Sequence, residues 1–276
     1  MTRRTLFAMP ALLSAQDAPL AHRFRRKMES GEVPLGVIIS FNDPAVTDAL
    51  ASALDFVWID AEHGAMSLPI IQGHVMAARS RNATAIVRVA WNDPVIIKPI
   101  LDLGAEGIVI PLVRTAEDAR RAVAACKYPP DGERGYGPRA PANYGRLSGP
   151  EFVKRTNDSV LIILQIEHID AVGNIEKILA VPGVSSLVIG SNDLSGSLGL
   201  LGQPRHPRVL AAIERVIAAA HKAKVWVGIG IGNDAAVIKE WIAKGMQWVS
   251  MGSDVALMLT GLNTVARDVR ESLRKR

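Results

Sequence analysis

Residues 160–193 read VLIILQIEHIDAVGNIEKILAVPGVSSLVIGSND, and they give the clearest indication of the architecture. Two short apolar runs, 160–166 and 186–189, flank a stretch with helical periodicity. Short runs of Val, Ile and Leu are typical of parallel strands that are buried on both faces. A strand, a helix and a second strand in this order predict a βα unit of a parallel sheet.

The same alternation extends along the chain in both directions, with no change in composition that would mark a domain boundary. The apolar runs cover residues 36–41, 56–60, 85–89, 107–112, 160–166, 186–189, 225–229 and 248–251. Eight consecutive βα units predict an α/β protein with a single closed (β/α)8 TIM barrel, and not an open, doubly wound sheet. The length of 276 residues suits one barrel with a short extension.

The extension lies at the N-terminus, so we assign residues 21–276 to the barrel domain and leave residues 1–20 out of it. The segment TRRTLF at positions 2–7 resembles a twin-arginine export signal, and a short apolar stretch follows up to Ala15. This stretch is brief and contains Pro10. We therefore favour a disordered N-terminal arm on a cytoplasmic protein, with export through a leader as the alternative.

The net charge of +5 does not indicate a nucleic-acid partner. Six basic and two acidic residues lie within the first 30 positions, so little net charge remains for the rest of the chain. Nucleic-acid-binding proteins concentrate basic residues on a folded face, and no such stripe is present. No apolar run reaches the roughly 20 residues that cross a bilayer, so no membrane partner is expected either. Local positive charge at the binding site of a small anionic substrate stays open.

Polar side chains collect at the ends of the predicted strands, where TIM-barrel enzymes carry their chemistry. They are Asp60, Glu62 and His63 after the second run, Arg88 in the third, Gln165 and Glu167 in and after the fifth, and Asn192 and Asp193 after the sixth. We expect these side chains to converge on one mouth of the barrel.

Glu167 and Asp193 are the candidate metal ligands. Two carboxylates on nearby strands, without paired cysteines, suit a hard divalent cation such as Mg²⁺ or Mn²⁺. Taken singly, each carboxylate is equally well explained by an ion pair or a helix cap. Their occurrence together at adjacent strand ends favours the metal.

His63 and Arg88 are the candidate catalytic groups. His63 lies three residues after Asp60, and an Asp–His pair of this kind orients an imidazole for work as a general base. Arg88 beside a metal would neutralise a developing enolate. The alternatives are a structural histidine and a structural salt bridge.

Two absences narrow the chemistry. No lysine is predicted at the catalytic end of a strand, where an imine-forming aldolase needs one, so metal-dependent enolate chemistry is favoured. Gly228, Gly230 and Gly232 alternate along the seventh run and do not form the dinucleotide-binding fingerprint. A nucleotide cofactor is therefore not expected.

Six separated segments occur in one order along the chain: FVWIDAEHG (56–64), VRVAWNDP (87–94), YPPDGERGYG (128–137), QIE (165–167), IGSNDLS (189–195) and GLLGQPRHPRV (199–209). On these segments the chain resembles, from about Gly36 to Leu259, the class II pyruvate aldolases of the HpcH/HpaI (4-hydroxy-2-oxoheptanedioate aldolase) type. The resemblance implies a TIM barrel of the phosphoenolpyruvate/pyruvate-binding type.

The resemblance also implies the roles of single residues. Glu167 and Asp193 would bind the divalent metal, with Mg²⁺ or Mn²⁺ as first choices and Co²⁺ as a further candidate. His63, oriented by Asp60, would carry out acid–base work, and Arg88 would stabilise the pyruvate enolate.

Other residues of the family pattern concern the substrate. Gln165 would contact it, and the backbone amides of Asn192 and Asp193 would hold the keto-acid carboxylate. Ser191 stands where the family commonly has proline, which is expected to alter this carboxylate pocket. His168 follows the metal glutamate where a small hydroxyl residue is usual, which makes it a candidate extra ligand or substrate contact.

The predicted activity is reversible aldol cleavage of a 4-hydroxy-2-oxo acid to pyruvate and an aldehyde. Two alternatives stay open: a CoA-thioester lyase of the malyl or citryl type, and a non-catalytic barrel that binds keto acids. The resemblance further implies a homo-oligomer, typically a hexamer with exchanged C-terminal helices. The apolar residues 255, 257–259 and 262 are compatible with this exchange, although ordinary packing of the eighth helix explains them equally well. We expect the long connection 128–158 to serve assembly.

Overall fold

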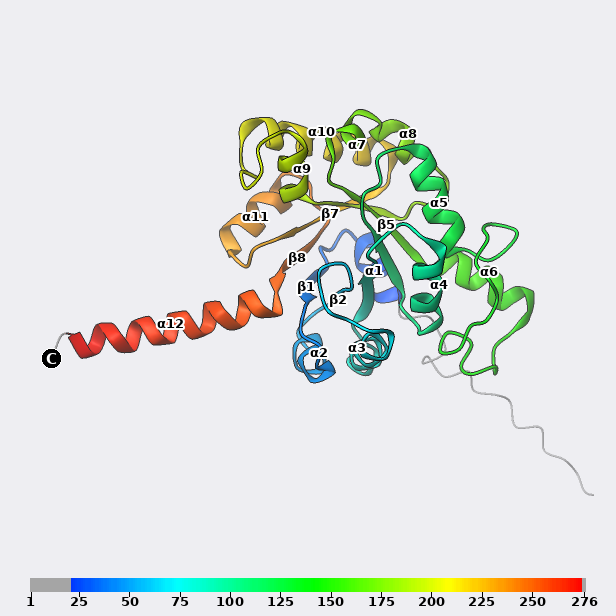
Figure 1. The fold of residues 1–276 in the computed structure, drawn as a ribbon, viewed down its shortest axis with the longest axis horizontal. Helices are drawn as coiled ribbons and strands as arrows, with labels where there is room; N and C mark the ends of the chain where they lie inside the picture. The colour runs from blue at the N-terminus through cyan, green and yellow to red at the C-terminus, as the bar shows by residue number, and fades with distance from the viewer. Residues whose placement is uncertain (1–20, 275–276) are drawn as a thin grey trace, which may run out of the picture.

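A closed barrel forms the centre of the molecule, as predicted. The computed structural model describes residues 21–274, so the expectations for residues 1–20 lie outside the described part of the chain. Eight parallel strands pair in the order β1 to β8, and β8 closes onto β1 (Figure 1). The strands are β1 Leu35–Ile39, β2 Phe56–Asp60, β3 Thr84–Arg88, β4 Gly107–Ile110, β5 Leu161–Ile166, β6 Ser186–Ile189, β7 Trp226–Ile231 and β8 Trp248–Ser253.

Helices follow the strands and surround the barrel (Figure 1). They are α1 Ala21–Glu29, α2 Pro44–Ala51, α3 Leu68–Ser80, α4 Pro94–Asp102, α5 Ala116–Cys126, α6 Gly149–Ser159, α7 Ile169–Gly173, α8 Ile175–Leu179, α9 Ser191–Ser197, α10 Pro207–Ala223, α11 Ala235–Ala243 and α12 Asp254–Arg274. Local sequence sets several of the starts. The carboxylate of Asp43 accepts the Ala45 N–H at 2.9 Å at the start of α2, where Pro44 suits the first helical turn.

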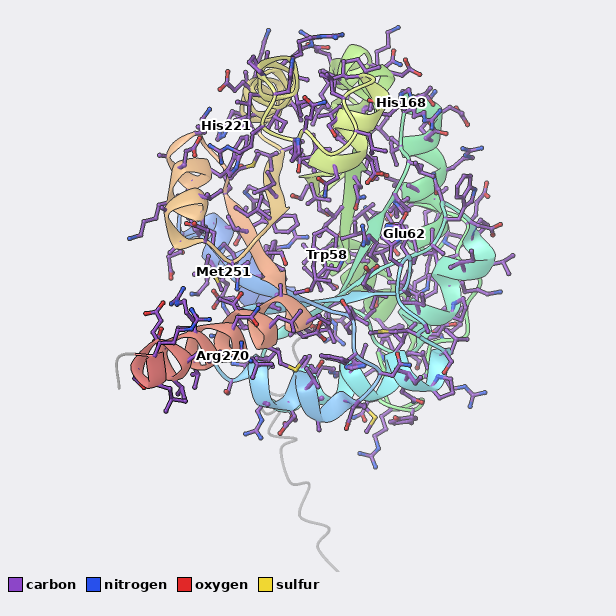
Figure 2. The ribbon with its side chains drawn as sticks, turned by 60° about the vertical axis from the view of Figure 1, so that its left-hand side comes forward. Trp58, Glu62, His168, His221, Met251 and Arg270 are labelled. Carbon is purple, nitrogen blue, oxygen red and sulfur yellow. The ribbon has the colours of Figure 1, made fainter. Side chains whose placement is uncertain are left out.

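Alternation along the strands separates two apolar layers. In β2, Val57 and Ile59 belong to the large cluster between sheet and helices, whereas Phe56 and Trp58 belong to a second cluster inside the barrel. Successive strand residues point to opposite faces, so the next inward position on β2 is Asp60. Figure 2 shows Trp58 within the barrel. The inward face of the strand therefore changes from apolar to charged towards its C-terminal end.

Aromatic rings fill the N-terminal end of the barrel. Phe24 of α1 packs edge-to-face against Phe56 and Trp248, with ring centroids 5.3 and 5.7 Å apart. Gly228 on β7 makes room for this cluster, because a Cβ there would lie 2.1 Å from the Trp248 ring. Gly228, the first of the alternating glycines, thus has a packing role in the barrel interior.

The connection 128–158 differs from the irregular segment that the sequence predicted, because it contains α6. Pro150 and Glu151 suit the first turn of a helix, and Phe152 anchors α6 in a small core with Tyr128 and Ala142. The proline and glycine content of the preceding residues concealed this helix. The proposed role in assembly is a separate matter, and it stays a prediction.

The last helix, α12, leaves the barrel. Figure 1 shows it as a straight helix that projects away from the other elements, and Arg270 lies far out on it in Figure 2. Its first two turns are anchored to the barrel. The buried Asp254 carboxylate accepts the N–H groups of Ser40 and Phe41 at 2.8 and 2.9 Å, Leu257 packs against the core, and the Asn233 amide donates to the Thr260 hydroxyl at 3.0 Å. Ordinary packing of this helix on its own barrel therefore accounts for Leu257, which packs against the core, but not for the exposed Met258, Leu259 and Leu262. None of the described helices is both long and apolar enough to cross a membrane.

Candidate active site

Strand register brings the predicted polar residues to one mouth. Asp60 and Arg88 are paired residues in the ladder between β2 and β3, and both face inwards by the alternation of their strands. On β5, Leu161 and Ile163 lie in the interior cluster, which makes Gln165 the next inward position and Glu167 the one after it. Neighbouring strands therefore present charged and amide groups at the same C-terminal end.

Arg88 is held by two carboxylates. Its Nε and one terminal nitrogen donate to the two oxygens of Asp60 at 2.9 and 2.6 Å, and its other terminal nitrogen lies 3.0 Å from Glu62. Its guanidinium also lies over the Trp58 ring, 5.5 Å from the centroid. Burial alone would raise the pKa of Asp60, but the hydrogen bonds and charge of Arg88 outweigh burial and keep that pKa below its usual range. Arg88 is thus fixed in one orientation at the mouth.

The expected orientation of His63 by Asp60 is not found. The Asp60 carboxylate is occupied by Arg88, and it reaches His63 only through the backbone N–H, at 3.4 Å. The imidazole itself is 68% exposed, and its Nε2 lies 3.7 Å from Glu62. A guanidinium offers two parallel donors to a carboxylate, which a single imidazole nitrogen cannot match. The structure therefore places His63 at the open rim, next to Glu62.

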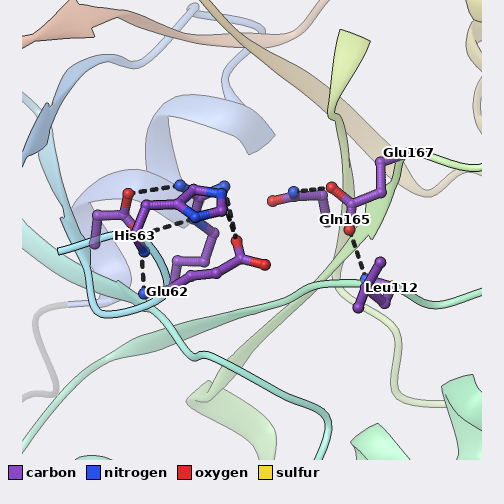
Figure 3. A network of polar contacts seen from close by, with 7 residues as sticks. Glu62, His63, Leu112, Gln165 and Glu167 are labelled. Carbon is purple, nitrogen blue, oxygen red and sulfur yellow. Dashed lines mark hydrogen bonds and ion pairs between the residues drawn. The ribbon is translucent and has the colours of Figure 1, made fainter. Parts of the chain in front are cut away.

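Glu62 is the residue whose importance the sequence did not indicate. It lies between Arg88 and His63. Across the mouth it faces Glu167, and Figure 3 shows the Gln165 amide beside Glu167 on the side towards Glu62. It was counted among the polar strand ends but was given no role. Its position two residues after the inward-facing Asp60 was the available signal.

The carboxylate of Glu167 is held by two donors (Figure 3). The backbone N–H of Leu112, just beyond β4, donates to Oε1 at 2.6 Å, and the Gln165 side-chain amide donates to Oε2. Gly190 allows this arrangement, because a Cβ there would lie 2.9 Å from Oε2 of Glu167. Sequence reasoning missed Leu112, since a backbone donor is independent of residue type and leaves no trace in the sequence.

Burial and like charges at the barrel mouth disfavour the ionised forms of Glu62 and Glu167. Burial raises the pKa of Glu167, and the charge of Asp193 raises it further, while the donors Gln165 and Leu112 oppose the shift. Burial also raises the pKa of Glu62; Arg88 lowers it, and the facing Glu167 adds to the rise. A cation between these carboxylates would relieve their repulsion.

Asp193 lies in the first turn of α9, which begins directly after β6. Asp193 and Asn192 are exposed, and Ser191 is half-buried. No side chain caps the start of α9, whose first N–H groups have no partner within a helix. The sixth strand thus brings a carboxylate and free backbone donors towards Glu167.

The residues present fit a hard divalent cation. No three side chains of His, Cys, Asp or Glu within residues 23–274 are grouped to hold a metal, so the protein would supply Glu167 and Asp193 alone. Each oxygen of Glu167 accepts one hydrogen bond and keeps a further acceptor site. The buried Oε1 of Gln165 has no hydrogen-bond partner among the described residues. It is available to a water or a substrate hydroxyl.

His168 has a local structural function. Its Nδ1 accepts the Asp170 N–H at 3.2 Å and caps the start of α7. It also lies 3.2 Å from the Asp170 carboxylate. The Nδ1 atom of His168 is therefore already used and is not free to bind a metal.

Comparison with known proteins gives a consistent result. The model of the HpcH/HpaI aldolase/citrate lyase family matches residues 37–260. A 4-hydroxy-2-oxo-heptane-1,7-dioate aldolase of Salmonella dublin is 35% identical over 249 residues, which cover 90% of this chain and 94% of that protein. An HpcH/HpaI aldolase from Desulfitobacterium hafniense DCB-2 is 34% identical with a TM-score of 0.83, covering 90% of this chain and 96% of that one. The citrate lyase beta subunit of M. tuberculosis shares the fold, at 13% identity and a TM-score of 0.53, over 83% of this chain and 95% of that one.

Proposed function

Because the chain belongs to the HpcH/HpaI aldolase/citrate lyase family, we propose that it is a metal-dependent aldolase, a carbon–carbon lyase, that reversibly cleaves a 4-hydroxy-2-oxo acid to pyruvate and an aldehyde. The observation that carries the proposal is the barrel mouth. There Glu167 and Asp193 lie opposite an arginine that is held by Asp60 and Glu62. Hard ligands on one side and a fixed cation on the other suit a substrate that becomes an enolate.

Glu167 and Asp193 are the proposed metal ligands, with Mg²⁺ or Mn²⁺ as the expected ions and Co²⁺ as a further candidate. Oxygen donors and open coordination positions are what these hard cations prefer. When bound, the metal would polarise the 2-oxo group of the substrate. Burial chiefly raises the pKa values of Glu62 and Glu167, and the neighbouring charges of Glu167 and Asp193 respectively add to the rise; a bound cation would offset both effects, which supports a metal at this place.

Arg88 is proposed to stabilise negative charge on the oxygen of the developing enolate. Its guanidinium is anchored to two carboxylates, so little reorganisation is needed when the charge appears. Asp60 then acts on Arg88 and not on His63. This assignment keeps Asp60 in the catalytic set and changes its role.

Proton transfer is assigned to His63, with Glu62 beside it. The base removes the proton of the C4 hydroxyl, the C3–C4 bond breaks, and the electron pair remains on C3 as the pyruvate enolate. Protonation at C3 then gives pyruvate, and the aldehyde leaves. The exposed imidazole of His63 can exchange its proton with solvent between turnovers.

Substrate binding is assigned to the start of α9 and to Gln165. The N–H groups of Ser191, Asn192 and Asp193 would hold the carboxylate of the keto acid, since a helix start attracts an anion. The Oε1 atom of Gln165, which has no partner among the described residues, would accept a hydrogen bond from a hydroxyl group of the substrate. Small-molecule 2-oxo acids and aldehydes are thus the proposed partners.

A homo-oligomer is also proposed, a hexamer by resemblance. The outer face of α12 bears Met258, Leu259, Leu262, Val265, Val269 and Leu273, all exposed although α12 is the helix that would cover β8 and β1. A second copy that donates its own α12 would cover both this face and the uncovered side of the barrel. Residues 1–20 are proposed to precede the domain as an arm or a leader.

Pyruvate release tests the reaction. Several 4-hydroxy-2-oxo acids that differ in the aldehyde half would be incubated with the protein and Mg²⁺ or Mn²⁺, and then with EDTA. We expect release from at least one substrate, lost with EDTA and restored by added metal. Equal release with and without EDTA would rule out the metal mechanism. No release, together with CoA binding in calorimetry, would favour the CoA-thioester lyase; keto-acid binding without turnover would favour the binding protein.

A further inference from the structure

Leu112 has a backbone conformation that is unusual for leucine. Its φ is +57°, in the left-handed region, and it follows β4 at the catalytic end of the barrel. A Cβ is crowded by the backbone in this region, so such a residue persists only where its surroundings hold it. The other described non-glycine residues of this kind lie in turns or at a helix end, and no mouth carboxylate bonds to them; they are Asn82, Asn143, Tyr144 and Lys224.

The neighbours of Leu112 explain what holds it. Its N–H donates to Oε1 of Glu167 at 2.6 Å, a short bond to a carboxylate oxygen. On either side the chain is fixed, because β4 precedes it and the buried Val113 follows. With both sides fixed, φ can return to a negative value only if the preceding peptide plane rotates. That rotation would turn the N–H away from Glu167.

We propose that Leu112 is a positioning residue, whose left-handed backbone holds Glu167 in the orientation that receives the divalent metal. This inference rests on the proposed function, because it takes Glu167 as a metal ligand. With Gln165 on the other oxygen, both oxygens of Glu167 are fixed before the metal arrives. Such outer partners of a ligand preserve metal affinity.

The test is Mn²⁺ affinity, measured by calorimetry on the metal-free, full-length protein. Leu112→Val introduces a β-branched side chain, which tolerates this region poorly, and we expect the Kd to rise by roughly tenfold to a hundredfold. Leu112→Gly keeps the N–H and accepts a positive φ without strain, so its Kd should stay within about threefold of wild type. Lys224→Val is the matched control, since Lys224 has a φ of 58° far from the mouth. It should lower stability and leave the Kd unchanged.

Each outcome decides between the two proposals. Wild-type affinity in folded Leu112→Val, or an equal loss in Lys224→Val, would overturn the role of Leu112 alone. If wild type binds no Mn²⁺, or Glu167→Ala binds it as tightly as wild type, the metal site itself is wrong and Leu112 loses its role with it.

A second readout needs no substitution at Leu112. Amide hydrogen exchange, followed by NMR in the metal-free protein, should show a protected Leu112 N–H that exchanges at least about tenfold faster in Glu167→Ala. An unchanged exchange rate would show that Glu167 does not hold this N–H.

Discussion

Arg88 donates two parallel hydrogen bonds to Asp60 and forms an ion pair with Glu62, and these contacts together fix the plane of its guanidinium at the barrel mouth. The inward position of Arg88 followed from strand alternation in the sequence. The choice of partner did not, because it depends on whether the Arg88 guanidinium or the His63 imidazole reaches the Asp60 carboxylate with better geometry. Only the three-dimensional arrangement shows that Arg88 occupies it and that His63 does not.

Replacement of Arg88 tests whether the fixed guanidinium matters. Arg88→Lys keeps the charge but loses the parallel donors, so we expect kcat to fall by about a hundredfold, with a smaller change in KM. Steady-state pyruvate release gives both constants. Arg81→Lys is the matched control, because Arg81 forms an equally bidentate pair with Asp48 on the surface. If Arg88→Lys keeps wild-type kcat, Arg88 does not stabilise the enolate.

The raised pKa values in the mouth make metal binding sensitive to acid. A metal binds the ionised carboxylate, so affinity is complete above the raised pKa of Glu167 and is lost as the pH falls through it. We expect Mn²⁺ affinity to begin falling at a pH above the ordinary glutamate value of 4.5. Calorimetry from neutral pH downwards measures this.

Glu62→Gln provides the comparison for that profile. It removes a like charge that faces Glu167, so the decline in Mn²⁺ affinity should move to lower pH. A decline centred at 4.5 in both proteins would contradict the electrostatic account.

At the scale of the elements, the strands could be predicted and one helix could not. Most of the strands are compact runs rich in Val, Ile or Leu, and all eight are found near their predicted positions. The helix α6 follows a segment rich in proline and glycine, so its start at Gly149 and Pro150 gave no distinct signal. The sequence also did not show why Gly228 of β7 is a glycine. The cause is the Trp248 ring on the neighbouring strand β8, which leaves no room for a Cβ.

Gly228 gives a test of how the strands pack. A Cβ at this position would meet the fully buried Trp248 at 2.1 Å, and the ring has no free space to move into. We expect Gly228→Ala to lower the free energy of unfolding by about 2–3 kcal/mol, measured by urea denaturation. Gly232→Ala, with nothing within 4 Å of its Cβ, should change it little. Equal midpoints for the two variants would contradict this packing.

At the scale of the whole molecule, α12 is the feature that one barrel does not explain. Leu262 and Val265 are 61% and 64% exposed on a helix that makes few contacts beyond its first two turns. The sequence left two explanations of this apolar face, exchange between subunits and packing on the same barrel. Both place apolar residues on one side of a helix, so their spacing in the sequence is the same. In the structure, packing on the same barrel accounts for Leu257 but leaves Leu262 and Val265 exposed.

Assembly through α12 is testable by analytical ultracentrifugation. Leu262→Glu places a charge on the apolar face, and we expect the oligomer to dissociate into smaller species. Thr264→Glu is the control, since Thr264 lies on the opposite side of the same helix and should leave the mass unchanged. A monomeric wild type, or an intact oligomer in Leu262→Glu, would show that α12 does not join subunits.

A metal held by Glu167 is proposed to drive the aldol cleavage. The most direct measurement is pyruvate release from 4-hydroxy-2-oxoheptanedioate in saturating Mn²⁺, by wild type and by Glu167→Ala. We expect release by wild type and a loss of at least about a thousandfold in the folded variant, because the polarising cation is no longer held. Comparable rates for the two proteins would contradict it.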